Sequence, residues 1–184
     1  MKDRQFIANK AKVLNIPVVS INYSLSYAYE IGTDNASAIH TLMDYLTNEK
    51  NVQSTVFICG RKNSEEAKER KNAYLFYCQN HHINNLGCYG KSWDSDDGER
   101  TAEEFIHSIR PLPDCFICAN DNNARAFINV LKRHGIRVPE DVFVTGFDNQ
   151  ELAYAYSPRI TTINRNYFQI GYDAVQSLYQ LTMC

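Results

Sequence analysis

Short apolar runs that alternate with amphipathic helical stretches are the feature that most restricts how this chain can fold. In the clearest case, residues 113–119 contain an apolar run of strand length. Residues 124–134 then have apolar side chains at helical spacing, and residues 142–145 form a second strand-like run. Gly135 follows the helical stretch, and glycine is common just past the end of a helix. Pro139 restricts the backbone ahead of the next strand. The segment therefore has the pattern of a strand–helix–strand unit.

The same alternation extends along the chain. Strands are expected at residues 16–22, 54–59, 87–89, 115–119, 142–145 and 160–164, and helices at 34–48, 64–81, 101–109, 124–134, 150–156 and 168–181. The third of these helices begins at Thr101, where Thr-Ala-Glu-Glu has the form of a capping box, so residues 94–98 are expected to be a polar loop. Helices that separate short strands are typical of a parallel sheet with right-handed crossovers. We therefore predict an α/β fold with a doubly wound parallel sheet.

Polar residues follow two of the expected strands, at the point where each strand ends. Asn120 and Asp121 come directly after residues 113–119, and Asp148 lies just past residues 142–145. In open α/β sheets, ligands bind outside the carboxyl ends of the strands. The sequence therefore predicts a small-molecule pocket at this edge of the sheet.

Several segments, in this order and at these spacings, resemble the sensor domain of the lactose/galactose-repressor (LacI/GalR) family of transcriptional regulators. They are residues 15–22 (Asn-Ile-Pro-Val-Val-Ser-Ile-Asn), 32–35, 56–60, 70–74, 145–149 (Thr-Gly-Phe-Asp-Asn) and 158–162 with Gly171. The resemblance covers nearly the whole chain and implies a periplasmic-binding-protein-like fold, mainly its second subdomain plus part of the first. It implies a partial first subdomain at residues 1–33 (last strand and crossover), the second, C-terminal sensor subdomain at 34–160, and the return crossover with a first-subdomain helix at 161–184. It also implies a fragment that lacks the N-terminal DNA-binding part.

The resemblance further implies a ligand site made of four residues. Arg70 matches the arginine of the family's Arg-x-x-Gly motif, although Ala73 stands where the family has Gly, and Asp148 matches the aspartate of its Gly-(Tyr/Phe)-Asp motif. Asn120 falls on the residue before a family aspartate, and Trp93 falls where the family places an aromatic residue against the ligand. A hydroxyl-rich ligand suits this set, because Asp148 accepts hydrogen bonds, Arg70 donates them, and Trp93 offers a flat apolar face.

Each of the four residues also has a structural alternative. Asn120 and Asp148 can cap the helices that follow them, Arg70 can lie on a solvated helix face, and Trp93 can be a core or rim residue. Three neighbouring residues are expected to cap helices or to hinge the crossover: Asp34, Asn35 and Asp121.

The cysteines predict a reduced protein. Cys59, Cys115 and Cys118 lie in or at the end of expected strands, where a free cysteine behaves as a small apolar residue. The Cys115-x-x-Cys118 spacing is that of a redox motif, but a redox pair belongs at a helix N-terminus and these two lie in a strand. This cysteine usage fits a reducing cytoplasm, which is the expected location.

No motif for catalysis, for a cofactor or for a metal is present. Gly-x-Ser-x-Gly, the P-loop and Gly-x-Gly-x-x-Gly are absent, and His81-His82 has no further ligands at suitable spacing. The net charge of −2 gives no sign of a nucleic-acid-binding face in this chain, and no apolar run reaches the roughly 18 residues of a membrane span. We therefore expect no enzyme, no cofactor, no metal and no membrane partner.

The leading hypothesis, which follows from the resemblance, is the ligand-sensing domain of a cytoplasmic transcriptional regulator. It implies a small effector, with a sugar or related polar ligand as the first expectation, bound in a cleft between two subdomains. It also implies a homodimer and DNA binding through a domain absent from this chain. The alternatives are an exported sugar-binding receptor of a transporter, the sensor domain of a signalling enzyme, and a glycoside-processing enzyme, which needs two facing carboxylates.

Overall fold

The computed structural model describes residues 2–108 and 111–183, which form two compact units. The larger unit is Asn35–Arg165, and the smaller consists of the segment that ends at Asp34 and the segment that begins at Asn166. The limit at 34/35 lies one residue past the subdomain boundary expected at 33/34, and the limit at 165/166 lies five residues past the one expected at 160/161. Cys184 and the expected helix end at residue 109 lie outside the described residues.

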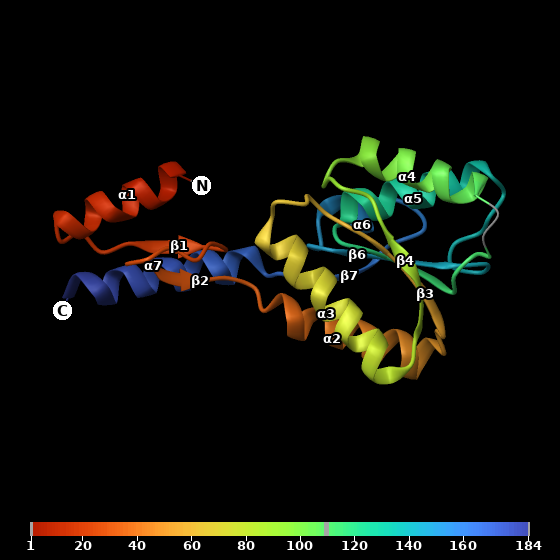
Figure 1. Ribbon diagram of the computed structural model, residues 1–184, viewed down its shortest axis with the longest axis horizontal. Helices are drawn as coiled ribbons and strands as arrows, with labels where there is room; N and C mark the ends of the chain where they lie inside the picture. Colours follow the sequence, from red (N-terminus) through yellow and green to blue (C-terminus); the bar gives the residue numbers. More distant parts are fainter. Residues whose placement is uncertain (1, 109–110, 184) are drawn as a thin grey trace. The chain divides into compact units, whose positions relative to one another are not determined.

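The larger unit is built around a five-stranded sheet in which all neighbouring strands are parallel, in the order β4-β3-β5-β6-β7. The strands are β3 (Ser54–Ile58), β4 (Asn84–Tyr89), β5 (Cys115–Cys118), β6 (Phe143–Phe147) and β7 (Thr161–Ile163). The helices are α2 (Asn35–Asp44) with the π-helical turn η1 (Tyr45–Glu49), α3 (Glu65–His81), α4 (Ser95–His107), α5 (Asp121–Arg133) and α6 (Glu151–Tyr154). Helices α2 and α3 cover one face of the sheet, and α4 and α5 cover the other (Figure 1). The predicted α/β fold with a doubly wound parallel sheet is confirmed.

Successive side chains of the central strands fill two separate cores. Phe57 and Ile117 pack with α2 and α3, whereas Val56 and Phe116 pack with α4 and α5. This division follows from strand geometry, since neighbouring side chains point to opposite faces of a sheet. Strands that are covered on both faces are apolar throughout, which explains the uninterrupted apolar run at β5.

Cys115 and Cys118 belong to different cores, because residues three apart on a strand face opposite sides. Both thiols are buried and free, as predicted. Burial raises the pKa of both thiols above the usual range, which keeps them protonated. The Cys-x-x-Cys spacing therefore serves the core and brings no two sulfur atoms to one redox or metal site.

Helix α4 starts earlier than predicted. It runs from Ser95 to His107, so the polar loop expected at residues 94–98 is wrong, and this segment instead supplies the N-cap position and the first turn. Thr101, the expected start, is buried within the helix. The acidic residues Asp96 and Asp97 lie in the first turn, where the helix dipole favours negative charge. The Thr-x-x-Glu pattern is therefore a chance match.

The smaller unit is a two-stranded parallel sheet with two helices. Its elements are α1 (Lys2–Val13), β1 (Val19–Ile21), β2 (Tyr29–Ile31) and α7 (Tyr167–Met183), of which α1 and β2 are missing from the sequence prediction. Little of its apolar surface is buried, and Val13 and Phe168 are 82% and 83% exposed. Throughout the described part of the chain, no helix combines the length and the apolar character that crossing a membrane requires.

Candidate functional site

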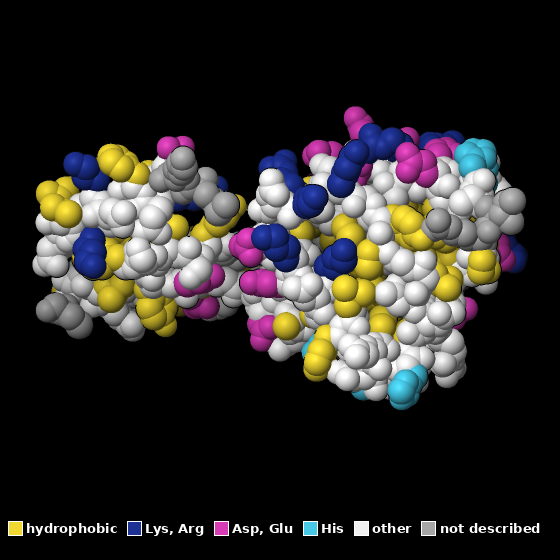
Figure 2. All heavy atoms as spheres, viewed as in Figure 1, with side chains coloured by type: hydrophobic (Ala, Val, Ile, Leu, Met, Phe, Trp, Pro, Cys, Tyr) yellow, Lys and Arg dark blue, Asp and Glu magenta, His cyan; other side chains and the backbone are white. Residues whose placement is uncertain are grey.

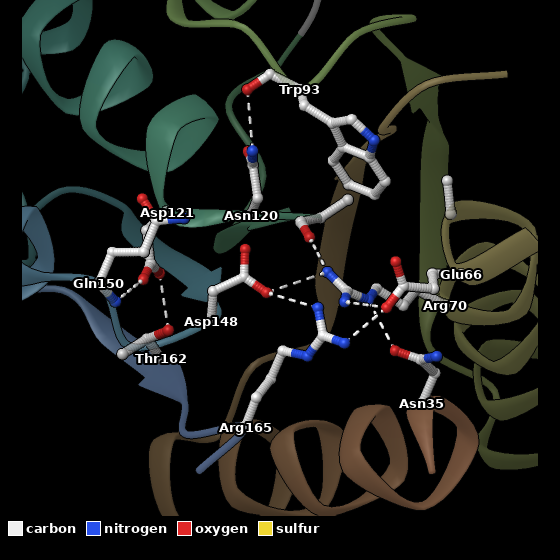
Figure 3. A network of polar contacts seen from close by, with 12 residues as sticks. Asn35, Glu66, Arg70, Trp93, Asn120, Asp121, Asp148, Gln150, Thr162 and Arg165 are labelled. Carbon is white, nitrogen blue, oxygen red and sulfur yellow. Dashed lines mark hydrogen bonds and ion pairs between the residues drawn. The ribbon is translucent and has the colours of Figure 1, made fainter. Parts of the chain in front are cut away.

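The four predicted ligand residues meet at the carboxyl edge of the five-stranded sheet (Figure 3). Arg70 reaches this edge from α3, and Trp93 lies in the loop after β4. Asn120 lies two residues past the end of β5, and Asp148 directly follows β6. Because the carboxyl ends of parallel strands share one edge, residues from four different parts of the sequence converge there.

Arg70 is a buried cation whose guanidinium is held by the larger unit itself. It is 1% exposed, so the alternative of a solvated helix face is wrong. Its Nε donates to Asn35 Oδ1 at 2.8 Å, and its Nη1 donates to the carbonyl of Ala119 at 2.6 Å. Its guanidinium carbon lies 3.6 Å from the ring centre of Phe147 and 5.5 Å from that of Trp93. These contacts fix the guanidinium at the carboxyl edge.

Asp148 is the buried carboxylate of the site. Its Oδ1 lies 3.6 Å from Nη1 of Arg70 and 3.5 Å from Nη1 of Arg165. Oδ1 is buried, and neither guanidinium comes close enough to form a full hydrogen bond with it. Burial raises the pKa of Asp148, and the two guanidinium groups oppose that rise. The alternative of a helix cap is wrong, because Gln150 occupies the N-cap position of α6.

The backbone at Asp148 is strained, with a φ angle of 110° that side-chain-bearing residues rarely adopt. The Asp148 N–H donates to the carbonyl of Ile163 at 2.9 Å, which ties this turn to the end of β7. Strain of this kind costs about 1–3 kcal/mol and is concentrated at ligand clamps and active sites. The turn therefore holds the carboxylate at the edge at the expense of stability.

Two further charged residues complete the network and are absent from the sequence prediction. Arg165 donates from Nη2 to Glu66 Oε1 at 2.6 Å, and Arg70 Nη2 lies 3.7 Å from the same oxygen. Arg165 lies just past β7, so the rule that selected Asp148 also selects it. Asn35, expected to cap a helix or hinge the crossover, holds Arg70 and donates to Glu69 at 2.7 Å. Arg70 and Arg165 are balanced in charge by Glu66 and Asp148, whereas the third carboxylate, Glu69, is exposed.

Asn120 and Trp93 form the other half of the site. The side-chain oxygen of Asn120 accepts from the N–H of Asn123 at 3.0 Å, and its amide nitrogen donates to the carbonyl of Trp93 at 2.8 Å. Asn120 therefore caps α5, which was its structural alternative, and also fixes the loop that carries Trp93. The Trp93 ring lies against Gly60, where an added Cβ would come within 2.0 Å of it.

Asp121 does not cap α5, contrary to expectation. Its carboxylate accepts from the N–H of Gln150 at 2.8 Å and from the hydroxyl of Thr162 at 2.6 Å. Gly146 leaves room for it, because a Cβ there would lie 2.1 Å from Asp121 Oδ1. Burial raises the pKa of Asp121 to about 6, against the effect of these two hydrogen bonds. Asp121 therefore joins α5 to the segments that follow β6 and form β7.

The chain matches the family model described as the periplasmic binding protein-like domain over residues 39–182. The NTD biosynthesis operon regulator NtdR of Bacillus subtilis is 30% identical over 119 residues, which are 64% of this chain and 36% of that protein. The ribose operon repressor of Lactococcus lactis is 22% identical over 169 residues, which are 91% of this chain and 51% of that protein. The chain thus spans about a third to a half of the length of these relatives.

Among solved structures, the Lac repressor dimer bound to operator and the anti-inducer ONPF superimposes with a TM-score of 0.86. It is 22% identical, and the match covers 98% of this chain and 63% of that one. At this level of identity the similarity demonstrates a shared fold.

Proposed function

The chain belongs to the family of periplasmic binding protein-like domains, as its resemblance to lactose-repressor-family sensors predicts, and we propose that it senses a neutral, hydroxyl-rich effector such as a sugar for a transcriptional regulator. The proposed ligand residues are Arg70, Trp93, Asn120 and Asp148, with Arg165 added from the structure. Asn120 acts by holding the Trp93 loop.

One observation carries this proposal: Asp148 Oδ1 is buried, and its two guanidinium partners stand at 3.5 and 3.6 Å, too far for a full hydrogen bond. A buried acceptor that lacks a full hydrogen bond costs roughly 1–3 kcal/mol. The two guanidinium groups at 3.5 and 3.6 Å offset part of that cost, and a ligand hydroxyl at hydrogen-bond distance removes the rest. A hydroxyl bound to an ionised carboxylate makes a short, strong hydrogen bond. A ligand hydroxyl is therefore expected to bind at Asp148 Oδ1, because this buried oxygen lacks a full hydrogen bond within the protein.

The charge balance of the network points to a neutral ligand. Glu66 and Asp148 offset Arg70 and Arg165, so a charged ligand would bring a buried charge without a free partner. The Trp93 ring beside Arg70 supplies the flat wall on which a sugar ring packs. A neutral polyol meets both conditions.

The relatives named above are regulators and repressors of operons, which supports a role in transcription. We propose that effector binding shifts a homodimeric, cytoplasmic regulator between two states that differ in affinity for DNA. Such a shift requires that the effector bind one state more tightly than the other. The alternatives, an exported receptor or a sensor of a signalling enzyme, are disfavoured by the same relatives.

A thermal-shift screen of pentoses, hexoses, disaccharides, nucleosides and nucleobases tests the ligand class. A ligand that binds only the folded chain raises its free energy of unfolding by RT ln(1 + [L]/Kd), and the melting temperature rises as a result. At least one neutral sugar is expected to stabilise the chain and to change the fluorescence of Trp93, its single tryptophan. Stabilisation by nucleobases alone would contradict the sugar class. DNA binding that is insensitive to the identified sugar, measured on the intact regulator, would contradict the sensing role.

A further inference from the structure

Three metal-ligand groups gather where the last turns of α4 and α5 lie together. Suitable atoms of Glu103, His107 and His134 all lie within 4.8 Å of one another. Glu103 Oε2 is 2.7 Å from Nε2 of His134 and 3.8 Å from Nε2 of His107. The two imidazole rings meet edge to face, with centroids 5.6 Å apart. Figure 2 shows histidine side chains (cyan) beside acidic ones (magenta) over this part of the larger unit.

The fold places these groups on two well-packed helices. Glu103 and His107 are four residues apart on α4 and therefore share one face. His134 is the C-cap residue of α5. The two helices approach closely because Gly98 faces Ala126, where an added Cβ would come within 2.9 Å of its neighbour. The cluster thus has a rigid support of the kind that a metal site needs.

We propose that Glu103, His107 and His134 form a binding site for a divalent transition-metal ion of the Zn²⁺ type. Imidazole nitrogen and carboxylate oxygen are ligands that zinc accepts, and water completes the coordination. In a tetrahedral zinc site, ligand atoms at about 2.0–2.2 Å from the metal stand roughly 3.3 Å apart. The two measured separations, 2.7 and 3.8 Å, bracket that value. Small rotations of the exposed histidines bring all three atoms into range.

The neighbouring charges leave one carboxylate oxygen for the metal. Arg133 donates to Glu103 Oε1 at 3.1 Å and also reaches Glu99 at 3.5 Å, so it fixes the carboxylate without occupying Oε2. A bound metal ion replaces the hydrogen bond between Glu103 and His134 and joins α4 to α5.

This site is independent of the proposed effector site. Helices α4 and α5 run antiparallel to the strands, so their C-terminal ends lie at the amino edge of the sheet, whereas Asp148 follows the carboxyl end of β6. The metal therefore stabilises the larger unit and does not contact the effector. Loss of zinc binding and loss of sugar binding are expected from different variants.

Calorimetric titration of Zn²⁺ into the full chain, in a buffer that does not chelate metals, tests the site. One equivalent of zinc is expected to bind, His107→Ala and His134→Ala are each expected to weaken it by at least about tenfold, and Glu103→Gln is expected to weaken it as well. His82→Asn is the matched control, because His82 is exposed and its positive φ tolerates Asn. The proposal would be overturned if the wild type bound no zinc, or if the variant that combines His107→Ala with His134→Ala still bound zinc as the wild type does.

Thiols are the competing zinc ligands in this chain, since Cys59 and Cys88 are partly exposed. The Cys59→Ser/Cys88→Ser variant is expected to bind zinc as the wild type does. Cobalt bound to the wild type is expected to show no thiolate charge-transfer absorption. A zinc equivalent that disappears with these cysteines assigns the metal to them and contradicts the histidine site. Far-ultraviolet circular dichroism of each variant confirms that the fold is intact.

Discussion

The Oδ1 atom of Asp148 lies 3.6 Å from Nη1 of Arg70, although Arg70 belongs to α3 and Asp148 follows β6. Arg70 reaches this carboxylate because it packs over the ring of Phe147 and donates to Ala119. Burial of the carboxylate favours its protonated form, and the guanidinium favours its ionised form. The pair therefore links the stability of the larger unit to the chemistry of its carboxyl edge.

Replacing Arg70 with Met is expected to destabilise the larger unit by about 3–5 kcal/mol, because Asp148 loses one of its two cations and Asn35 loses its donor. Urea unfolding at neutral pH measures the change. Arg137→Met is the control: its ion pair with Asp141 is exposed, so little change is expected. Equal losses in the free energy of unfolding from the two variants would show that the buried Arg70–Asp148 pair stabilises the chain no more than an exposed pair does.

Asp121 is expected to make stability fall with pH between about 4 and 6. Its pKa in the folded chain is about 6, above the ordinary value of 3.8, so the folded state keeps a proton in this window that the unfolded state has lost. The free energy of unfolding then decreases as pH rises through the window, by an amount on the order of 3 kcal/mol, and levels off above it. Denaturant unfolding at several pH values measures the difference in the free energy of unfolding between wild type and Asp121→Asn. A difference that does not change between pH 4 and 6 would contradict the raised pKa of Asp121.

Gly146→Ala is expected to destabilise the chain by roughly 1–3 kcal/mol, because the new Cβ would lie 2.1 Å from Asp121 Oδ1 and displace a buried carboxylate. Gly171→Ala is the matched control. Nothing lies within 4 Å of a Cβ at Gly171, which is within α7, so this change is expected to be neutral or stabilising by about 0.5–1 kcal/mol. Thermal unfolding compares them, and a neutral Gly146→Ala would contradict the close contact.

The sequence predicts the sheet well because its signals are local. Apolar runs of strand length, helix-ending glycines and polar residues at strand ends are each readable within a few residues, and they lead to Asn120 and Asp148 directly. Helix α4 shows the limit of local signals, since Thr101 carries a capping pattern but is buried within the helix. The short strand β2, which is missing from the sequence prediction, has too few residues to show a period.

The site could be predicted only in part because its contacts join distant segments. Glu66 and Arg165 meet at 2.6 Å, and no local pattern pairs a residue in the first turn of α3 with one after β7. The role of Asn120 in holding the Trp93 loop is likewise a long-range contact. The rule that ligand residues follow the carboxyl ends of strands selects Arg165 when it is applied to β7, but it does not select Glu66.

The chain is expected to self-associate through its smaller unit, where α7 exposes a large apolar surface. Phe168 and Val175 are 83% and 67% exposed, and apolar surface of this extent favours contact with a second copy. Light scattering over a range of concentrations is expected to show an association that Phe168→Glu/Val175→Lys reduces. A wild-type chain that stays monomeric at high concentration would contradict this expectation.

The most direct test of the account is the affinity of Asp148→Asn for the sugar that the thermal-shift screen selects. Asp141→Asn is the control, because Asp141 is an aspartate whose ion pair with Arg137 lies outside the network. Isothermal titration is expected to give wild-type affinity for Asp141→Asn and an affinity lower by roughly tenfold to a hundredfold for Asp148→Asn. Equal affinities for wild type and Asp148→Asn, with both variants folded, would contradict the claim that the buried carboxylate at the carboxyl edge binds the effector.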